Sequence, residues 1–199
     1  MLNAESHGFP HALATEVSLV LKITNQGTFY PPTHWFSVIV EGERLNIPYR
    51  IYVHPEYLTN AMQLKGNAGL IACCLGTRHS DGFIRERCLR ELIAHNEPWI
   101  TPYVIQLAGE YIMQILQLIE EKLPRAHAAQ YHAFYLENQA YFHSICVRIV
   151  SYWNEFYRDQ YPRWPDYPGY DLLSTLSKPP FNMVTGLPRL KRKKISIIS

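Results

Sequence analysis

The pattern of hydrophobic and polar residues is β-like in the first part of the chain. Runs rich in β-branched and aromatic residues predict strands at Val17–Ile23, Trp35–Val40 and Leu45–Val53. The last two runs flank Glu41-Gly42-Glu43, and a short turn with a glycine between such runs predicts a hairpin. Pro48 lacks an N–H group, so we expect it at an edge or a bulge. About three strands would form a small antiparallel sheet.

Helical spacing replaces this pattern after Val53. Pro55 suits a helix start, where a missing N–H costs nothing, and Gly76 suits a helix end. Ser80 or Asp81 can cap the next helix. The expected helices begin at Pro55 and then cover Ala68–Leu75, Ser80–Ile93, Trp99–Lys122, Ala126–Leu136, Gln139–Asp159 and a short Tyr170–Leu176. Trp99–Lys122 is apolar over most of its circumference, which predicts a central helix.

These elements predict an α+β fold, in which the small sheet packs on a bundle of about five helices. A chain of 199 residues corresponds to one domain, which we expect at residues 16–176. Its β-sheet part would be 16–54 and its helical part 55–160. A flexible N-terminus, 1–15, and a proline-containing basic tail, 177–199, would flank it.

Charge separates the tail from the body. The formal net charge is +2, but one short segment carries five basic residues: Arg189, Lys191, Arg192, Lys193 and Lys194. The body is therefore slightly acidic, and nucleic-acid binding is not expected of it. The basic tail suits acidic lipids or nucleic acid, or is simply solvated.

The cysteines indicate a reducing compartment. Cys73, Cys74, Cys88 and Cys146 fall in apolar helical patterns without a CxxC pair, so we expect core residues and no metal site. The N-terminus lacks the features of a signal peptide, and polar residues interrupt the longest apolar helix, so neither secretion nor a membrane span is expected. A cytoplasmic protein without a cofactor is the expectation.

Candidate chemistry is concentrated around Arg78-His79-Ser80-Asp81-Gly82. The common nucleotide, hydrolase and metalloprotease motifs are absent from the sequence. His79 and Asp81 are candidates for acid–base catalysis, and Arg78 and Arg85, with Trp99, for binding an anionic ligand beside a helix N-terminus. The alternative is a tight interhelical turn in which Asp81 only caps the helix.

Glu110 is the third catalytic candidate, expected midway along the apolar helix. It has three interpretations: a member of a solvated stripe with Gln106 and Gln117, a buried partner of Arg78, Arg85 or Arg87, or a functional carboxylate with a raised pKa.

Most of residues 45–176 resembles a group of uncharacterised bacterial proteins. The resemblance is carried by IPYRIYVHPEYL, RHSDGFIRERCLRELI, PWITPYVIQLAGEYIMQIL, VSYWNEFYR and DYPGYDLL. It implies no activity. An Asp-Gly turn followed by an arginine-rich helix and a largely apolar helix is also similar to one HEAT-type hairpin, but solenoids need several such units.

Two functions of the body follow as hypotheses, and binding of nucleic acid or a membrane through the basic tail is a third. The first is a protein–protein interaction or adaptor protein, favoured because catalytic signatures are absent and the helices are rich in tyrosine. The alternative is an enzyme or a binder of small anions that uses Arg78, His79, Asp81 and Arg85 with Glu110. The first predicts an exposed aromatic patch, the second a concave pocket that contains those residues.

Overall fold

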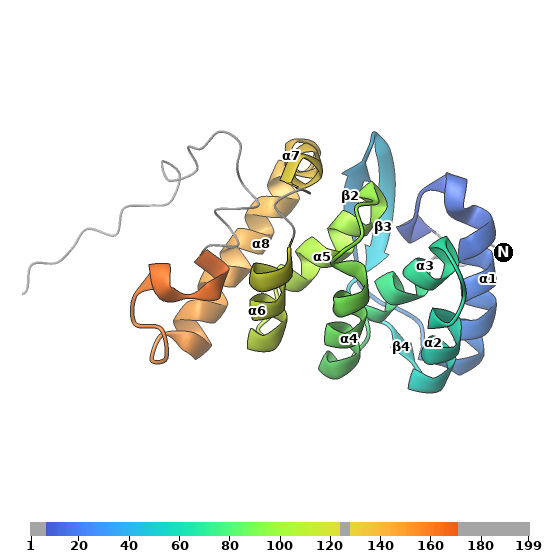
Figure 1. Cartoon of the computed structure of the whole chain (residues 1–199), viewed down its shortest axis with the longest axis horizontal. Helices are drawn as coiled ribbons and strands as arrows, with labels where there is room; N and C mark the ends of the chain where they lie inside the picture. Colours follow the sequence, from blue (N-terminus) through green and yellow to red (C-terminus); the bar gives the residue numbers. More distant parts are fainter. Residues whose placement is uncertain (1–6, 124–127, 171–199) are drawn as a thin grey trace, which may run out of the picture.

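A computed structural model describes residues 7–123 and 128–170. Its helices follow one another along the long axis of the molecule in nearly the order of the sequence (Figure 1). They are α1 (Ala14–Thr24), α2 (Pro55–Met62), α3 (Asn67–Gly76), α4 (Gly82–Leu92), α5 (Thr101–Ala108), α6 (Met113–Lys122), α7 (Ala128–Glu137) and α8 (Gln139–Tyr152). With short antiparallel strands near the N-terminus, the α+β class is confirmed.

The prediction of a strand at Val17–Ile23 is wrong, because these residues belong to α1. The buried residues of this helix are Val17, Val20, Leu21 and Thr24, which recur at helical spacing and face the core. Their β-branched character suggested a strand, but packing against α2 and α3 overrides this weak propensity. The predicted sheet part, 16–54, therefore contains a helix.

The strands form two separate pairs. β2 (Trp35–Val40) and β3 (Glu43–Pro48) form the expected hairpin, and β1 (Thr28–Tyr30) pairs with β4 (Tyr52–Val53). The third expected strand is thus divided between β3 and β4. Pro48 is the last residue of β3, opposite Trp35, so its missing N–H falls where the ladder ends.

The hairpin turn is hydrogen-bonded to the end of α7. Glu41 and Gly42 have positive φ angles of 51° and 81°, as a tight two-residue turn requires. Their N–H groups donate to the Glu137 carboxylate at 3.1 and 2.9 Å. The Asn138 side chain bonds both the N–H and the C=O of Ile39 at 2.7 Å. These bonds fix the hairpin against the helical layer.

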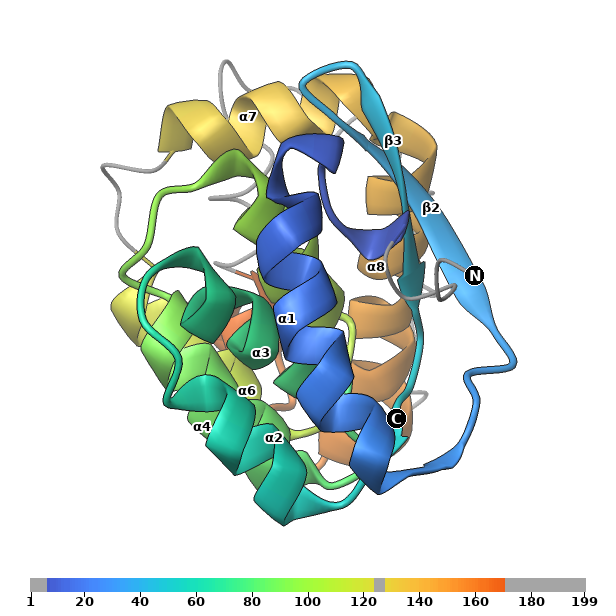
Figure 2. The ribbon, with the colours of Figure 1, turned by 90° about the vertical axis from the view of Figure 1, so that its right-hand side faces the viewer.

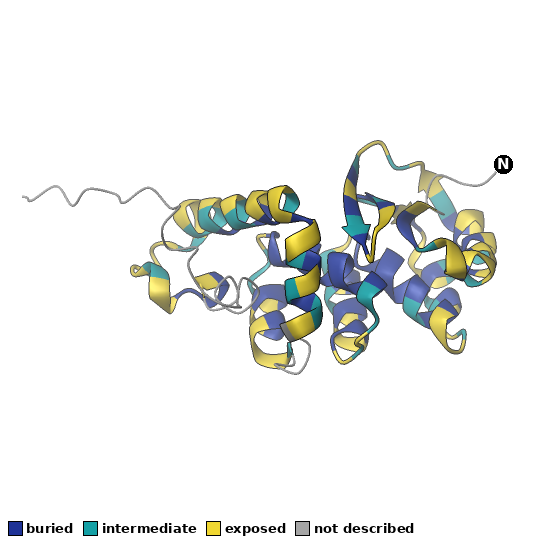
Figure 3. Cartoon of the chain, turned by 90° about the horizontal axis from the view of Figure 1, so that it is seen from above, coloured by how far each residue is buried: buried dark blue, intermediate teal, exposed yellow. Residues whose placement is uncertain are grey.

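The helices pack mainly on their neighbours in sequence. α1 lies on α2 and α3, α3 on α4, and α4 on α6, while α5 contacts α7 and α8. Figure 2 shows α7 lying across one end of this arrangement. Buried residues line the facing sides of the helices and exposed ones the outside (Figure 3). The predicted starts of α2 at Pro55 and of α4 after the Asp81 cap are confirmed.

The prediction of one long helix at Trp99–Lys122 is wrong. A 3-10 turn (Pro98–Ile100) leads into α5, which ends at Ala108 with Gly109 as its C-cap, and α6 begins only at Met113. A Cβ at Gly109 would lie 3.1 Å from the Ile145 side chain, so the glycine permits a close approach of α8. Glu110 therefore lies in the turn between two helices rather than midway along one.

The last described helix also differs from its prediction. α8 ends at Tyr152 and continues as a π-helical turn, Trp153–Tyr157, short of the expected Asp159. The expected helix at 170–176 and the basic residues Arg189, Lys191, Arg192, Lys193 and Lys194 lie outside the described residues. Among the helices that are described, none combines the length and the hydropathy needed to cross a bilayer.

Candidate functional site

The turn between α3 and α4 is held against the strand that leads into β4. The N–H of Ile51 donates to the Arg78 carbonyl at 2.8 Å, and the N–H of Ser80 donates to the Ile51 carbonyl at 3.2 Å. His79 thus pairs with Ile51 in an isolated bridge. These bonds bring Arg50, which precedes Ile51, close to the turn.

Three arginines converge on the carboxylate of Glu110, which is 5% exposed. Glu110 Oε1 lies 2.8 Å from Arg50 Nη1 and 3.4 Å from Arg78 Nη2, and Oε2 lies 2.7 Å from Arg85 Nε. We call these four residues the Glu110 cluster. Its three guanidinium groups face one carboxylate, so it carries an excess of positive charge.

Burial is greatest at Arg78, whose side chain is fully inaccessible. Its Nε donates to Thr77 Oγ1 at 3.3 Å, while its Nη1 is buried without a hydrogen-bond partner. Burial lowers the pKa of Arg78 to about 10, although Glu110 opposes this shift. Burial also lowers the pKa of Arg85, whose Nη1 donates to the carbonyls of His79 and Ser80 at 2.8 and 2.9 Å. Arg78 and Arg85 therefore hold positive charge in a buried environment.

His79 uses both ring nitrogens within the turn. Nδ1 accepts from the N–H of Asp81 at 2.9 Å, which leaves the proton on Nε2, and Nε2 donates to the Val53 carbonyl at 2.8 Å. Asp81 Oδ1 accepts from the N–H of Phe83 at 2.8 Å and caps α4. Both catalytic candidates of this turn are thus engaged in holding it.

The structure unites some of the predicted residues and separates another. Arg78 and Arg85 meet Glu110, as one interpretation of the sequence expected. Trp99 lies at the opposite end of α5, where its ring packs on Phe9 with centroids 6.0 Å apart. Sequence reasoning missed Arg50. Its one signal is a charged residue inside the apolar run IPYRIYV.

An aromatic surface continues from the Glu110 turn. Tyr111, 54% exposed, and Phe156, 60% exposed, pack with Tyr152 as three rings whose centroids are 6.0–6.2 Å apart. The Tyr157 hydroxyl donates to the Tyr111 carbonyl. These bonds and contacts anchor α8 and its π-turn to the residue next to Glu110. We call Tyr111, Tyr152 and Phe156 the Tyr111 surface.

Phe83, the most exposed of the large apolar side chains among the described residues, stands near this surface. It follows Gly82, where a Cβ would lie 2.8 Å from Cδ1 of Ile112, the residue after Tyr111. The start of α4 and the start of α6 therefore meet beside the aromatic rings.

A second aromatic surface lies on the β1–β4 pair. Phe29 is 61%, Tyr30 69% and Tyr52 38% exposed. The rings of Tyr30 and Tyr52 are 6.3 Å apart, and Phe29 contacts His54 at 6.0 Å. We call Phe29, Tyr30 and Tyr52 the Tyr30 surface.

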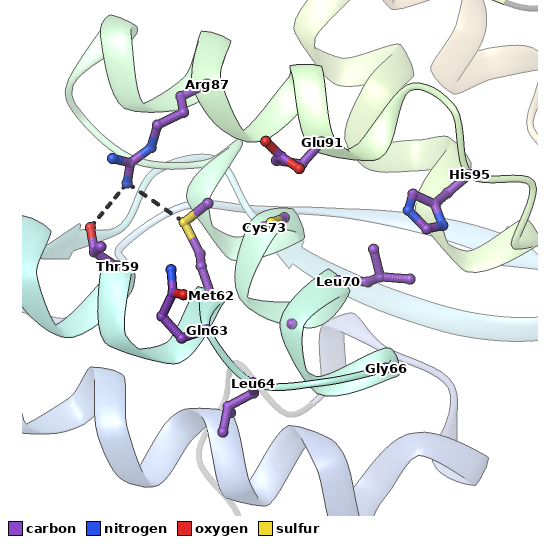
Figure 4. A pocket seen from close by; sticks show the side chains of 11 residues that line it. Thr59, Met62, Gln63, Leu64, Gly66, Leu70, Cys73, Arg87, Glu91 and His95 are labelled. Carbon is purple, nitrogen blue, oxygen red and sulfur yellow. Dashed lines mark hydrogen bonds between the residues drawn. The ribbon is translucent and has the colours of Figure 1, made fainter.

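An open pocket of about 490 Å³ lies elsewhere, between α2, α3 and α4 (Figure 4). Its lining includes Met62, Cys73, Arg87 and His95. The candidate residues of the α3–α4 turn and Glu110 are not among those that line it.

No family model, curated protein or solved structure matches this chain. Function is therefore inferred from the chain's own residues.

Proposed function

We propose that the protein is an interaction protein that binds a protein partner through the Tyr111 surface. The observation that carries the proposal is a set of three mutually packed rings, two of them more than half exposed, directly beside a buried charged cluster. Exposed tyrosine and phenylalanine rings offer large apolar area with little side-chain entropy to lose, and aromatic residues are enriched at interaction hot spots.

The charge beside the rings indicates the chemistry of the partner. Arg50 is the accessible member of the Glu110 cluster, with 32% of its side chain exposed. It shares one carboxylate with two other arginines, so its charge is incompletely balanced. A partner segment with an aspartate or glutamate beside apolar residues would complement both features.

The Glu110 cluster also supplies rigidity to the surface. Arg85 joins Glu110 to two carbonyls of the α3–α4 turn, and Tyr157 holds Tyr111 from the other side. A surface fixed before binding loses less entropy on association, which favours affinity.

Panning a random peptide phage library against the full chain tests the proposal. The expected result is enrichment of peptides with an acidic residue among apolar ones. A parallel panning on Tyr111→Ser/Phe156→Ser should not enrich them, whereas one on the matched Phe29→Ser/Tyr30→Ser variant should. Enrichment of the same peptides on all three proteins would refute the proposal.

A second candidate function is the binding of a small anion by the Glu110 cluster. Arg78 favours it, because its Nη1 is buried without a hydrogen-bond partner and three guanidinium groups share one carboxylate. Calorimetric titration with inorganic phosphate and with acetate tests it. Saturable binding that is lost in Arg50→Ala would support a small-anion site, and absence of heat with both anions would remove it.

Catalysis is not part of either proposal, because His79 has no free ring nitrogen to act as a base. We place the protein in the cytoplasm, since Cys73, Cys74, Cys88 and Cys146 are free thiols, which a reducing compartment maintains.

A further inference from the structure

Two sulfur-containing side chains, Met62 and Cys73, line the pocket between α2, α3 and α4, and the buried Cys88 lies behind them. Cys88 Sγ lies 3.8 Å from Met62 Sδ. Interaction with Cys88 lowers the pKa of Cys73 and raises that of Cys88, so the two thiols are neighbours. Met62 ends α2, Cys73 lies on α3 and Cys88 on α4, so the fold assembles a group that no local sequence motif contains.

The packing makes room for this group. Cys88 is fully buried, and a Cβ at Gly76 would lie 2.2 Å from its sulfur, so the glycine leaves the space that the thiol occupies. Met62 and Cys73 line the pocket of about 490 Å³, which gives access from solvent (Figure 4). Met62 and Cys73 are thus within reach of a small ion from the pocket, and Cys88 contacts Met62 from the buried side.

We propose that Met62, Cys73 and Cys88 form a three-sulfur binding site for a soft monovalent metal ion of the Cu(I) class. Thiolate and thioether ligands select Cu(I), while harder ions prefer oxygen and imidazole. A metal–thiolate bond of about 2.3 Å places two ligand sulfurs of a trigonal site about 4 Å apart. The 3.8 Å separation of Cys88 and Met62 matches this requirement.

The charges nearby suit an ion in this site. Each thiol would lose its proton to solvent on binding, so two thiolates and one monovalent ion leave a single negative charge. Arg87 offsets it, because its Nη2 lies 3.6 Å from Met62 Sδ. Zinc fits less well, since structural zinc sites use four ligands. The described part of the chain holds no group of three or more His, Cys, Asp or Glu placed for a metal.

Anaerobic titration of the full chain with Cu(I), in competition with a chromogenic Cu(I) chelator, tests the site. The expected result is one tightly bound equivalent. Cys73→Ser and Cys88→Ser should weaken it by on the order of a hundredfold, since even residues behind metal ligands change affinity by 10–100-fold. Cys74→Ser and Cys146→Ser are the matched controls and should bind as the wild type does.

Met62→Leu distinguishes a three-sulfur site from a two-thiol site. Because leucine keeps the volume of the side chain, this variant also serves as a test if the serine variants fail to fold. It should weaken binding by about tenfold or more. X-ray absorption of the loaded protein should show three sulfur neighbours. Unchanged affinity in Met62→Leu, equal loss in Cys74→Ser, or no competition with the chelator would each overturn the proposal.

Discussion

The two aromatic surfaces differ in what lies beneath them. The Tyr30 surface rests on β1 and β4, which are three and two residues long and pair with a shift in register. The Tyr111 surface begins one residue after Glu110, whose carboxylate is joined to three arginines. Exposure is similar, since Tyr30 is 69% and Phe156 60% exposed, but the Tyr111 surface begins directly beside a buried charged cluster.

This difference shows why exposed rings alone do not identify a binding surface. Single exposed apolar side chains are common on monomeric proteins. A binding surface also needs a fixed shape and a polar feature that selects the partner. In our proposal, the Glu110 turn and Arg50 give the Tyr111 surface both. The following variants break one surface or the other, in order of decreasing expected effect.

Glu110→Ala should cause the largest loss of stability. It removes the only carboxylate that the Glu110 cluster contains and leaves Arg78 and Arg85 buried without a charge partner. Breaking a buried ion pair in this way costs about 3–5 kcal/mol. Urea denaturation measures the change. Glu155→Ala, at an exposed site in the π-turn, is the control, and its free energy of unfolding should stay within about 0.5 kcal/mol of the wild type. Equal stability of the two variants would contradict the importance of the cluster.

Gly27→Ala should disturb the Tyr30 surface instead. A Cβ at Gly27 would lie 2.3 Å from the Tyr57 ring, which itself packs on His54. Overpacking of this kind costs about 1–3 kcal/mol. Thermal unfolding should show the loss, while affinity for the selected peptides should be unchanged. Exposed Lys22→Ala, in the preceding helix, should leave both unchanged. Loss of peptide affinity in Gly27→Ala would show that the Tyr30 surface also takes part in binding.

Arg50→Ala should have the smallest effect on stability, about 1 kcal/mol, because the side chain is partly exposed and Glu110 keeps two arginine partners. It should nevertheless weaken the binding of acidic peptides. Peptides in which glutamine replaces the acidic residue should bind wild type and Arg50→Ala alike. Arg44→Ala, an exposed arginine on β3, is the matched control. If Arg44→Ala weakens the binding of acidic peptides as much as Arg50→Ala does, Arg50 has no specific role in that binding.

Local signals predicted those elements that short-range chemistry determines. The β2–β3 hairpin follows from alternation around Glu41-Gly42, and α4 from the Asp81 cap. The errors arise where packing between distant residues decides the structure. Residues 17–23 are β-branched yet form a helix on the core, and the helix expected at 99–122 is interrupted where Glu110 turns inward.

The candidate site was predictable only in part, for the same reason. Arg78, Arg85 and Glu110 were recognisable because they stand in or beside apolar segments. Arg50 joins Glu110 across a separation of 60 residues, and no local pattern reports such a pair. Cys88 meets Met62 between different helices in the same way. Pairings set by tertiary packing leave little trace in a single sequence.

The most direct test of the Tyr111 surface is calorimetric titration of one selected acidic peptide into three proteins of matched stability. These are the wild type, Tyr111→Ser/Phe156→Ser and Phe29→Ser/Tyr30→Ser. Truncating hot-spot aromatic residues costs about 2 kcal/mol or more, a loss of roughly thirtyfold in affinity. We expect this loss in the Tyr111 variant and unchanged affinity in the Tyr30 variant. Equal affinity in both variants, or a greater loss in the Tyr30 variant, would contradict the account.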